Sequence, residues 1–457
     1  MPSLDFHRSR RDALRSLTNT PILLMGNKER ARNIPMNHLP FRQDSSFLYF
    51  TGCSSPNAAL LLTQDKELLF LPSPPKNDAL WHGPTPSIQK QAEQLGFRHV
   101  ADRNSLADHI KPLVKTIQTI AVPDLSINLD LESWLQRKFR FGTSHCGSPE
   151  LINAICTLRR ILEDEEIDIL RQTMLTTHKA HVAAMKKTRP NAHEQDIAAA
   201  FYYELVKTGC SAAYQSIVTV DGHILHNHHY HNTLKSGQLL LLDGGAESPS
   251  GYSTDITRTW PVSGSFTSRQ KRAYNAVLQA QDLAISMVTK GTRYRDIHFK
   301  ACEHLASFLC DEKLLLGSEE EALETGAHAL FFPHGVGHLL GLDVHDLENF
   351  GDVAAYAPGR ARPEGFGSAY LRLDLDLSPG MVVTIEPGFY IVPEIFKNTD
   401  LIEKHRQRIN WSTLKDWIGF GGIRIEDNIL CTNKEPEILS SMIPKGTDDI
   451  EMLMNEQ

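Results

Sequence analysis

Four acidic side chains occur in apolar, strand-like segments, and together with one histidine they could bind metal ions. They are Asp243 in QLLLLDGG, Asp255 in STDITRTW, Glu386 in MVVTIEPG and Glu426 in GIRIEDNIL, and the histidine is His338 in HGVGHLLGLDVHD. An unpaired carboxylate is costly to bury, so such groups require positive charge nearby. Four carboxylates and one imidazole suit two divalent ions of the harder sort, such as manganese, iron or cobalt.

Paired metal ions favour hydrolytic chemistry. Two ions about 3.5–4 Å apart can bridge a hydroxide nucleophile and polarise a carbonyl, which predicts hydrolysis of an acyl bond. Taken singly, each acid has a plainer interpretation as an exposed residue at a strand end or turn. The metal hypothesis therefore depends on the five side chains meeting in one pocket.

Strand periodicity indicates how these side chains could meet. A hairpin between the segments of Asp243 and Asp255 would bring the two carboxylates together, and both stay ionised only if positive charge lies between them. In GIRIEDNIL, side-chain alternation places Arg424, Glu426 and Asn428 on one face of a strand. The strand ends are therefore expected to supply most of the ligands.

Histidines are concentrated in two stretches. His334 and His338 have the spacing of a helical zinc pair, but the intervening Gly-Val-Gly disfavours a helix and the glutamate of HExxH is missing, so this alternative is rejected. The second stretch, HILHNHHYH at residues 223–231, carries five histidines. A solvated loop is the favoured interpretation of its later members, with a secondary metal-trapping patch as the alternative. These later members are His228, His229 and His231.

The length and composition of the chain bound its class. With 457 residues, it exceeds what one hydrophobic core usually supports, so two or more domains are expected. A net charge of -8 without a long Lys/Arg run disfavours nucleic acid as a partner. No apolar run approaches the roughly 20 residues of a transmembrane helix, so no membrane partner is expected. Seven scattered cysteines without a CxxC pair fit reduced thiols and predict a cytoplasmic protein.

The first third of the chain has the pattern of an α/β unit. Apolar runs at residues 21–25, 58–63, 67–72 and 117–122 predict strands, with a further apolar run at 47–52, and residues 8–17 and 131–139 predict helices. Strands that alternate with helices imply a mixed or parallel sheet. Few acids or histidines cluster here, so this part is expected to support the site or tune its specificity.

The remainder of the chain has a faint internal duplication. Residues 185–197 and 287–297 each follow a long helical pattern and precede another helix, at 198–206 and 298–309. Two α-α-β halves about a pseudo-two-fold axis would produce this order. Coincidence between short Thr-Arg and Asp-Ile matches is the alternative.

Five motifs, in order, make the chain similar to a known family. LLLLDGGAE, STDITRTWPV, HGVGHLLGLDVHD, VVTIEPGFYI and GGIRIEDNILCT resemble those of the pita-bread metallopeptidases, most closely the aminopeptidase P and prolidase branch. RQDSSFLYFTG extends the resemblance into the N-terminal region, so it covers nearly the whole chain. The resemblance implies an N-terminal α/β domain of aminopeptidase P type at 1–155 and a pita-bread catalytic domain, α+β with pseudo-two-fold symmetry, at 156–457. It also implies a homo-oligomer, a dimer or tetramer.

The resemblance implies a role for each ligand candidate. Asp243, Asp255, His338, Glu386 and Glu426 would hold two divalent ions, with manganese favoured, and Glu386 would also act as general base. All five positions are filled, which disfavours the metal-free creatinase-like relatives and the non-catalytic ones. Two departures, Asn191 in place of the usual glycine and one extra residue between the two aspartates, affect no ligand.

Further residues resemble those that contact the substrate in the family. His226 and His334 match pocket histidines, and His345 is placed to hydrogen-bond the scissile carbonyl. Arg424 would orient the neighbouring ligand carboxylate or reach the substrate. Trp81 resembles a tryptophan at the substrate entrance, with simple packing as the alternative.

The implied reaction is cleavage of an Xaa-Pro bond in proline-containing peptides. The GLDVHD form of the histidine motif and the RQDSSFLYFTG segment favour an Xaa-Pro aminopeptidase. However, residues 347–377 resemble a prolidase insert, in which Arg372 matches an arginine that binds the free carboxylate of a dipeptide. A surface arginine near Asp374 and Asp376 is the plainer interpretation. An Xaa-Pro dipeptidase (prolidase) therefore stays open, as does, more remotely, a non-catalytic peptide-binding protein.

Overall fold

The computed structural model describes residues 2–456 and divides them into two compact units. The first unit runs to Arg160 and includes Leu347–Ala354, and the second comprises Ile161–Asp346 and the chain from Ala355 onward. The boundary expected from the sequence falls inside helix α7 (Pro149–Arg159), which belongs to the first unit. Among the described residues, no helix has both the length and the apolar character that crossing a membrane requires.

The first unit is built on a five-stranded mixed sheet. Its strand order is β4-β3-β2-β1-β5, with antiparallel pairing in the centre and parallel pairs at both edges. The strands are β1 (Ile22–Met25), β2 (Ala59–Leu62), β3 (Glu67–Leu71), β4 (Val100–Asp102) and β5 (Gln118–Thr119). Side chains such as Leu23, Leu61 and Phe70 pack against Ile127 and Leu131 to form the core of this unit. The expected α/β character is confirmed.

Capping residues explain where the helices of this unit differ from the sequence prediction. The apolar run at 47–52 is helical, because Asp44 accepts a hydrogen bond from the Phe47 N–H and Gly52, at φ 63°, ends the helix. The helix expected at 131–139 begins earlier, because Asp124 caps it. The helices are α1 (Leu4–Leu17), α2 (Ser45–Thr51), α3 (Ala79–His82), α4 (Ile88–Gln94), α5 (Leu106–Ile110), α6 (Leu125–Leu135) and α7.

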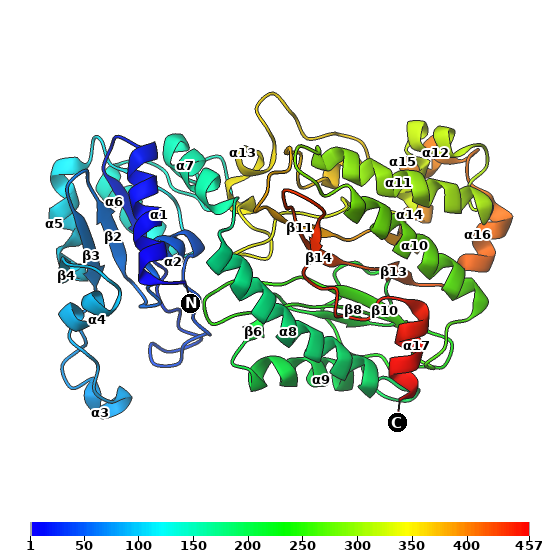
Figure 1. Ribbon diagram of the computed structural model, residues 1–457, viewed down its shortest axis with the longest axis horizontal. Helices are drawn as coiled ribbons and strands as arrows, with labels where there is room; N and C mark the ends of the chain where they lie inside the picture. Colours follow the sequence, from blue (N-terminus) through cyan, green and yellow to red (C-terminus); the bar gives the residue numbers. More distant parts are fainter. Residues whose placement is uncertain (1, 457) are drawn as a thin grey trace. The chain divides into compact units, whose positions relative to one another are not determined.

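The second unit contains two pairs of long helices, each followed by strands. The first pair is α8 (Asp164–Lys187) and α9 (Glu194–Lys207), and the second is α10 (Ser268–Ser286) and α11 (Tyr294–Asp311). Helices α8 and α9 pack against strands that lie within residues 211–247, whereas α10 packs against strands that lie within residues 382–424 (Figure 1). The α-α-β order expected from the internal duplication is therefore present in both halves.

The strands of this unit form short antiparallel sheets that meet at the site. Their orders are β10-β8-β7, β11-β14-β15, β12-β13 and β6-β9. The strands are β6 (Ser211–Ala212), β7 (Ile217–Thr219), β8 (Leu239–Asp243), β9 (Ala246–Glu247), β10 (Thr257–Pro261), β11 (Val382–Ile385), β12 (Gly388–Tyr390), β13 (Gly422–Arg424), β14 (Asp427–Leu430) and β15 (Glu437–Ile438). The shorter helices of this unit are α12 (Glu319–Thr325), α14 (Pro393–Lys397), α15 (Thr399–His405), α16 (Trp411–Trp417) and α17 (Thr447–Asn455). Helix α13 (Asp352–Ala355) lies mostly in the segment that belongs to the first unit.

Candidate metal centre and active site

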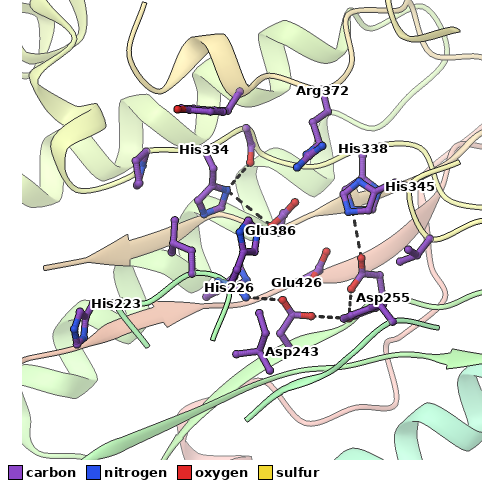
Figure 2. A pocket seen from close by; sticks show the side chains of 18 of the residues that line it. His223, His226, Asp243, Asp255, His334, His338, His345, Arg372, Glu386 and Glu426 are labelled. Atoms are coloured by element: carbon purple, nitrogen blue, oxygen red, sulfur yellow. Dashed lines mark hydrogen bonds and ion pairs between the residues drawn. The ribbon is translucent and has the colours of Figure 1, made fainter. Parts of the chain in front are cut away.

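The five ligand candidates meet in one cavity of about 600 Å³ in the second unit. Their ligand atoms form overlapping groups, each within 4.8 Å: Asp243 with Asp255 and Glu426, and His338 with Glu386 and Glu426. Figure 2 shows them converging from different segments of the chain. Because Glu426 belongs to both groups, the arrangement suits two neighbouring ions that share a ligand.

Strand pairing brings the two aspartates together as the sequence predicted. In the β8–β10 hairpin, Asp243 lies opposite Thr257, which is two residues after Asp255. Between the two aspartates β9 forms, and the Ser248 N–H donates to the Tyr252 carbonyl. Gly245 is required here, because a Cβ at this position would lie 1.7 Å from the Thr254 carbonyl oxygen.

The histidine motif lies beside β11, which places His338 next to the strand that ends in Glu386. The His338 N–H donates to Thr384 Oγ1 at 3.1 Å, and the His338 carbonyl accepts from the Thr384 N–H at 3.0 Å. His338 Nδ1 donates to the Leu339 carbonyl, so Nε2 faces the carboxylates, 3.4 Å from Asp255 Oδ2. The segment is not helical, which agrees with the rejection of a helical zinc pair.

Arg424 and Thr257 hold two of the carboxylates. Arg424 Nη2 lies 2.5 Å from Asp243 Oδ2, and its Nε donates to Thr257 Oγ1. The Thr257 hydroxyl donates to Glu426 Oε2 at 2.8 Å. Arg424 thus contacts Asp243 directly and reaches the expected carboxylate, Glu426, through Thr257.

Burial and mutual repulsion shift the titration of these acids. Burial raises the pKa of Glu386 to about 7. His338 and Arg424 oppose this rise, whereas the nearby Asp255 and Asp243 add to it. Burial also raises the pKa of Glu426 well above its usual value, again with repulsion from the other acids. The pKa of Asp243 is raised by burial in spite of Arg424. One arginine therefore does not neutralise four acids, and this donor set fits divalent cations.

Further histidines of the cavity lie near the carboxylates, among them His345 and His334. His345 stacks on His338 with ring centroids 3.9 Å apart, and it forms a third possible ligand group with Asp255 and His338. His334 Nδ1 donates to the Gly335 carbonyl, so its Nε2 accepts from the Tyr390 hydroxyl at 2.9 Å. Burial, aided by Arg424, lowers the pKa of His334 to about 3, so this ring is neutral.

Two tyrosines at the site were missed by the sequence reasoning. The Tyr214 hydroxyl contacts Asp243 Oδ1 at 2.5 Å and also Asp255 Oδ1. Tyr390 accepts a hydrogen bond from Arg424 and thereby links it to His334. Tyr390 could have been found, because strand alternation continues from Glu386 to this position, but nothing in the local pattern marks Tyr214.

The histidine-rich stretch contributes more to the cavity than expected. His223, His226 and His228 all line it, although only His226 was expected to face the substrate. His229 and His231 are exposed and stack on each other with ring centroids 5.1 Å apart. Within residues 2–456, the side-chain groups able to hold a metal ion include no histidine of this stretch. The structure thus gives no support to the secondary metal patch.

The two remaining substrate candidates lie in different units. Arg372 lines the cavity together with Phe366 and Tyr370 of the inserted segment. Figure 2 shows it near His334 and His338 on one side of the pocket, with His226 and Asp243 on the other. Trp81 belongs to the first unit, on α3, and is 75% exposed. Its role at the substrate entrance stays a prediction.

Comparison with known proteins identifies the family. Residues 168–433 match the model of metallopeptidase family M24, and residues 6–121 match the aminopeptidase P N-terminal domain. An Xaa-Pro aminopeptidase from Haemophilus influenzae is 31% identical over 455 residues, covering 96% of this chain and 94% of that protein. The Escherichia coli Xaa-Pro aminopeptidase is 30% identical over 432 residues, covering 91% and 89%.

Solved structures agree with this relationship. Aminopeptidase PepP of Pseudomonas aeruginosa superposes with a TM-score of 0.81 at 26% identity, covering 99% of this chain and 98% of the other. The resemblance inferred from the five motifs, and the fold that it implied, are confirmed. The chain belongs to metallopeptidase family M24 and carries the N-terminal domain of aminopeptidase P.

Proposed function

We propose that this metal-dependent proline peptidase is an Xaa-Pro aminopeptidase, which releases the first residue from peptides with proline in second position. The observation that carries the proposal is the convergence of four carboxylates and His338 in one cavity of a chain with an aminopeptidase P N-terminal domain. Relatives that match over most of their length bear the name Xaa-Pro aminopeptidase. We expect two divalent ions, with manganese favoured by the oxygen-rich ligand set.

The roles of the residues follow from their surroundings. Asp243, Asp255, His338, Glu386 and Glu426 would hold two divalent ions, which when bound supply Lewis acidity for amide hydrolysis. Glu386, which lines the cavity beside the other acids, is also the candidate general base.

The remaining polar groups would act on the peptide itself. His345, His226 and His334 line the cavity, and His345 is the candidate donor to the developing oxyanion. The leaving group, a secondary amine, requires a proton as the bond breaks, and the neutral His334 carries a proton on Nδ1 that is engaged with Gly335. We therefore assign His334 to positioning through Tyr390 rather than to proton delivery.

A direct assay tests the proposal. Purified protein supplied with manganese should release the N-terminal residue from Arg-Pro-Pro and longer peptides, and Glu386→Gln should not. If the wild-type protein cleaves only the dipeptides Arg-Pro and Gly-Pro, the aminopeptidase assignment is wrong. If it cleaves none of these peptides, the enzyme acts on a different bond.

An Xaa-Pro dipeptidase is the second candidate, because Arg372 lines the cavity and could bind a free carboxylate close to the scissile bond. The segment that carries it is firmly held: Arg293 forms two hydrogen bonds of 2.6 Å with the buried Asp374. A dipeptidase predicts that Arg372→Met raises KM for Arg-Pro far more than for Arg-Pro-Pro. The N-terminal domain and the named relatives favour the aminopeptidase.

The cellular setting is also a proposal. The scattered cysteines support a cytoplasmic location, since such spacing suits a reducing compartment. We expect a homo-oligomer and no nucleic-acid partner, on the grounds given by the family resemblance and the mild net charge. Sedimentation analysis of the purified protein would measure its oligomeric state.

A further inference from the structure

The histidine loop, defined here as residues 221–231, brings three histidines to the cavity without any regular secondary structure of its own. It lies between β7 and β8. Loops of this length are mobile unless their backbone is tied down. Any role of His226 in the reaction therefore requires something that fixes the loop.

The two ends of the loop are joined by one buried carboxylate, that of Glu194. Its Oε1 accepts from the Val220 N–H at 2.9 Å, just before the loop, and its Oε2 accepts from the Asn232 N–H at 3.0 Å, just after it. The Asn232 side-chain amide also donates to Oε1 at 3.0 Å and to Asp221 Oδ2 at 2.9 Å. Glu194 is 0% exposed. One side chain thus closes the base of the loop.

The surroundings of Glu194 explain why a carboxylate is used. Both oxygens accept main-chain N–H groups, which a carboxylate can do and a carboxylic acid or amide cannot do equally well. Within residues 2–456, no Lys, Arg or His side chain forms an ion pair with Glu194, so these hydrogen bonds and the N-terminus of α9 supply the compensation for burial. A buried carboxylate is costly, and the groups that compensate the Glu194 carboxylate are main-chain N–H groups at the two ends of the loop.

The neighbouring chain extends this anchor. The Glu194 N–H donates to the Asn232 carbonyl, the Asn191 N–H donates to the Leu234 carbonyl, and the Leu234 N–H donates to the Ala192 carbonyl. Asn191 adopts φ 70°, the left-handed region that favours glycine, and asparagine tolerates it better than most residues. This explains why asparagine can stand where the family usually has glycine. The segment before α9 is therefore shaped to hold the end of the loop.

We propose that Glu194 is a positioning residue of the reaction, which fixes the histidine loop so that His226 keeps its place at the cavity. The inference rests on the proposed function, because it assigns the effect of Glu194 on catalysis to His226. Glu194 itself does not line the cavity and is not one of the metal-ligand candidates.

The substitution Glu194→Gln tests the clamp with little change of shape. In either orientation of the amide, its NH2 group faces one of the two main-chain N–H donors, so one of the two main-chain hydrogen bonds to this side chain is lost. Hydrogen exchange of the metal-free protein should become at least about tenfold faster within 220–232 and should stay unchanged in α9. Glu204→Gln is the matched control on the same helix, since that carboxylate contacts Lys207 and, within residues 2–456, no part of the histidine loop.

A double-mutant cycle with His226→Ala separates positioning from general stability. Glu194→Gln should lower kcat/KM about tenfold or more in the wild-type background but less than about twofold when His226 is already alanine. Glu194→Gln should leave the metal content unchanged in both backgrounds. Equal losses in the two backgrounds, or no local change in exchange, would overturn the proposal.

Two further points keep the test decisive. If Glu194→Gln does not fold, Asn232→Ala removes the side-chain part of the clamp and should give a smaller increase in exchange over the same residues. The exchange measurement requires no activity, so a wild-type protein that fails to cleave Xaa-Pro peptides would refute the proposed function, while faster exchange would still support the clamp.

Discussion

Replacing the candidate general base should stabilise the metal-free protein. Glu386 lies half-buried among other acids, and its pKa of about 7 means that the folded chain resists ionisation of this carboxyl. In the unfolded chain the same group has its ordinary value of 4.5. Between these two values the folded state therefore holds more protons than the unfolded state, and this contribution to the unfolding free energy falls as pH rises.

The magnitude follows from the two pKa values. From pH about 5 to pH about 8, the ionisation of Glu386 should cost the folded state roughly 2–3 kcal/mol. Glutamine does not titrate, so the Glu386→Gln variant should gain stability over the wild type by about this amount as the pH rises. Buried histidines with lowered pKa, such as His181 and His298, affect both proteins alike and cancel in the comparison.

Urea unfolding of protein stripped of metal by a chelator would measure the difference across this pH range. Glu403→Gln, an exposed substitution on α15, is the control and should leave the unfolding free energy unchanged. Added manganese should make the wild type more stable than Glu386→Gln, because the wild type gains stability from metal binding and the variant lacks one ligand. A constant difference between wild type and Glu386→Gln at all pH values would refute the account of a repulsive, metal-requiring site.

Three other predictions follow from the same structure. Glu386→Gln should lower kcat for Arg-Pro-Pro by about 10²-fold or more with its fold retained by circular dichroism, and retention of activity would exclude it as general base. Arg372→Met should leave kcat/KM for Arg-Pro-Pro within about threefold if the enzyme is an aminopeptidase, and a selective loss with Arg-Pro would instead indicate a dipeptidase. Asp427→Asn should destabilise the protein by about 3–5 kcal/mol in thermal unfolding, because Arg258, which is fully buried and lies 2.7 Å from Asp427, would lose its partner. Burial opposes ionisation of Asp427, but Arg258 and Lys445 outweigh this effect and lower its pKa to about 2. The stabilisation by Asp427 should therefore be present above pH about 4 and be lost as the pH falls toward 2. An unchanged melting temperature of Asp427→Asn would contradict this prediction.

Much of the fold was accessible from local sequence patterns. Helix α8 and strands β2, β3, β8 and β11 lie where periodicity and apolar runs predicted them, because burial of one face dictates the spacing of apolar residues. The errors were local as well: the run at 47–52 is apolar enough for a strand, but caps at both ends make it a helix. Short apolar runs do not distinguish these two structures by periodicity alone.

The sequence by itself determined which acids lie at strand ends, and hence the five side chains that could share metal ions. Only the tertiary structure decided which other groups join them. Tyr214 reaches two aspartates, and Glu194 reaches the far end of a loop, through contacts between residues 29 to 41 positions apart in the chain. Such contacts depend on how strands and helices pack, and packing leaves no periodic trace in the residues that make them.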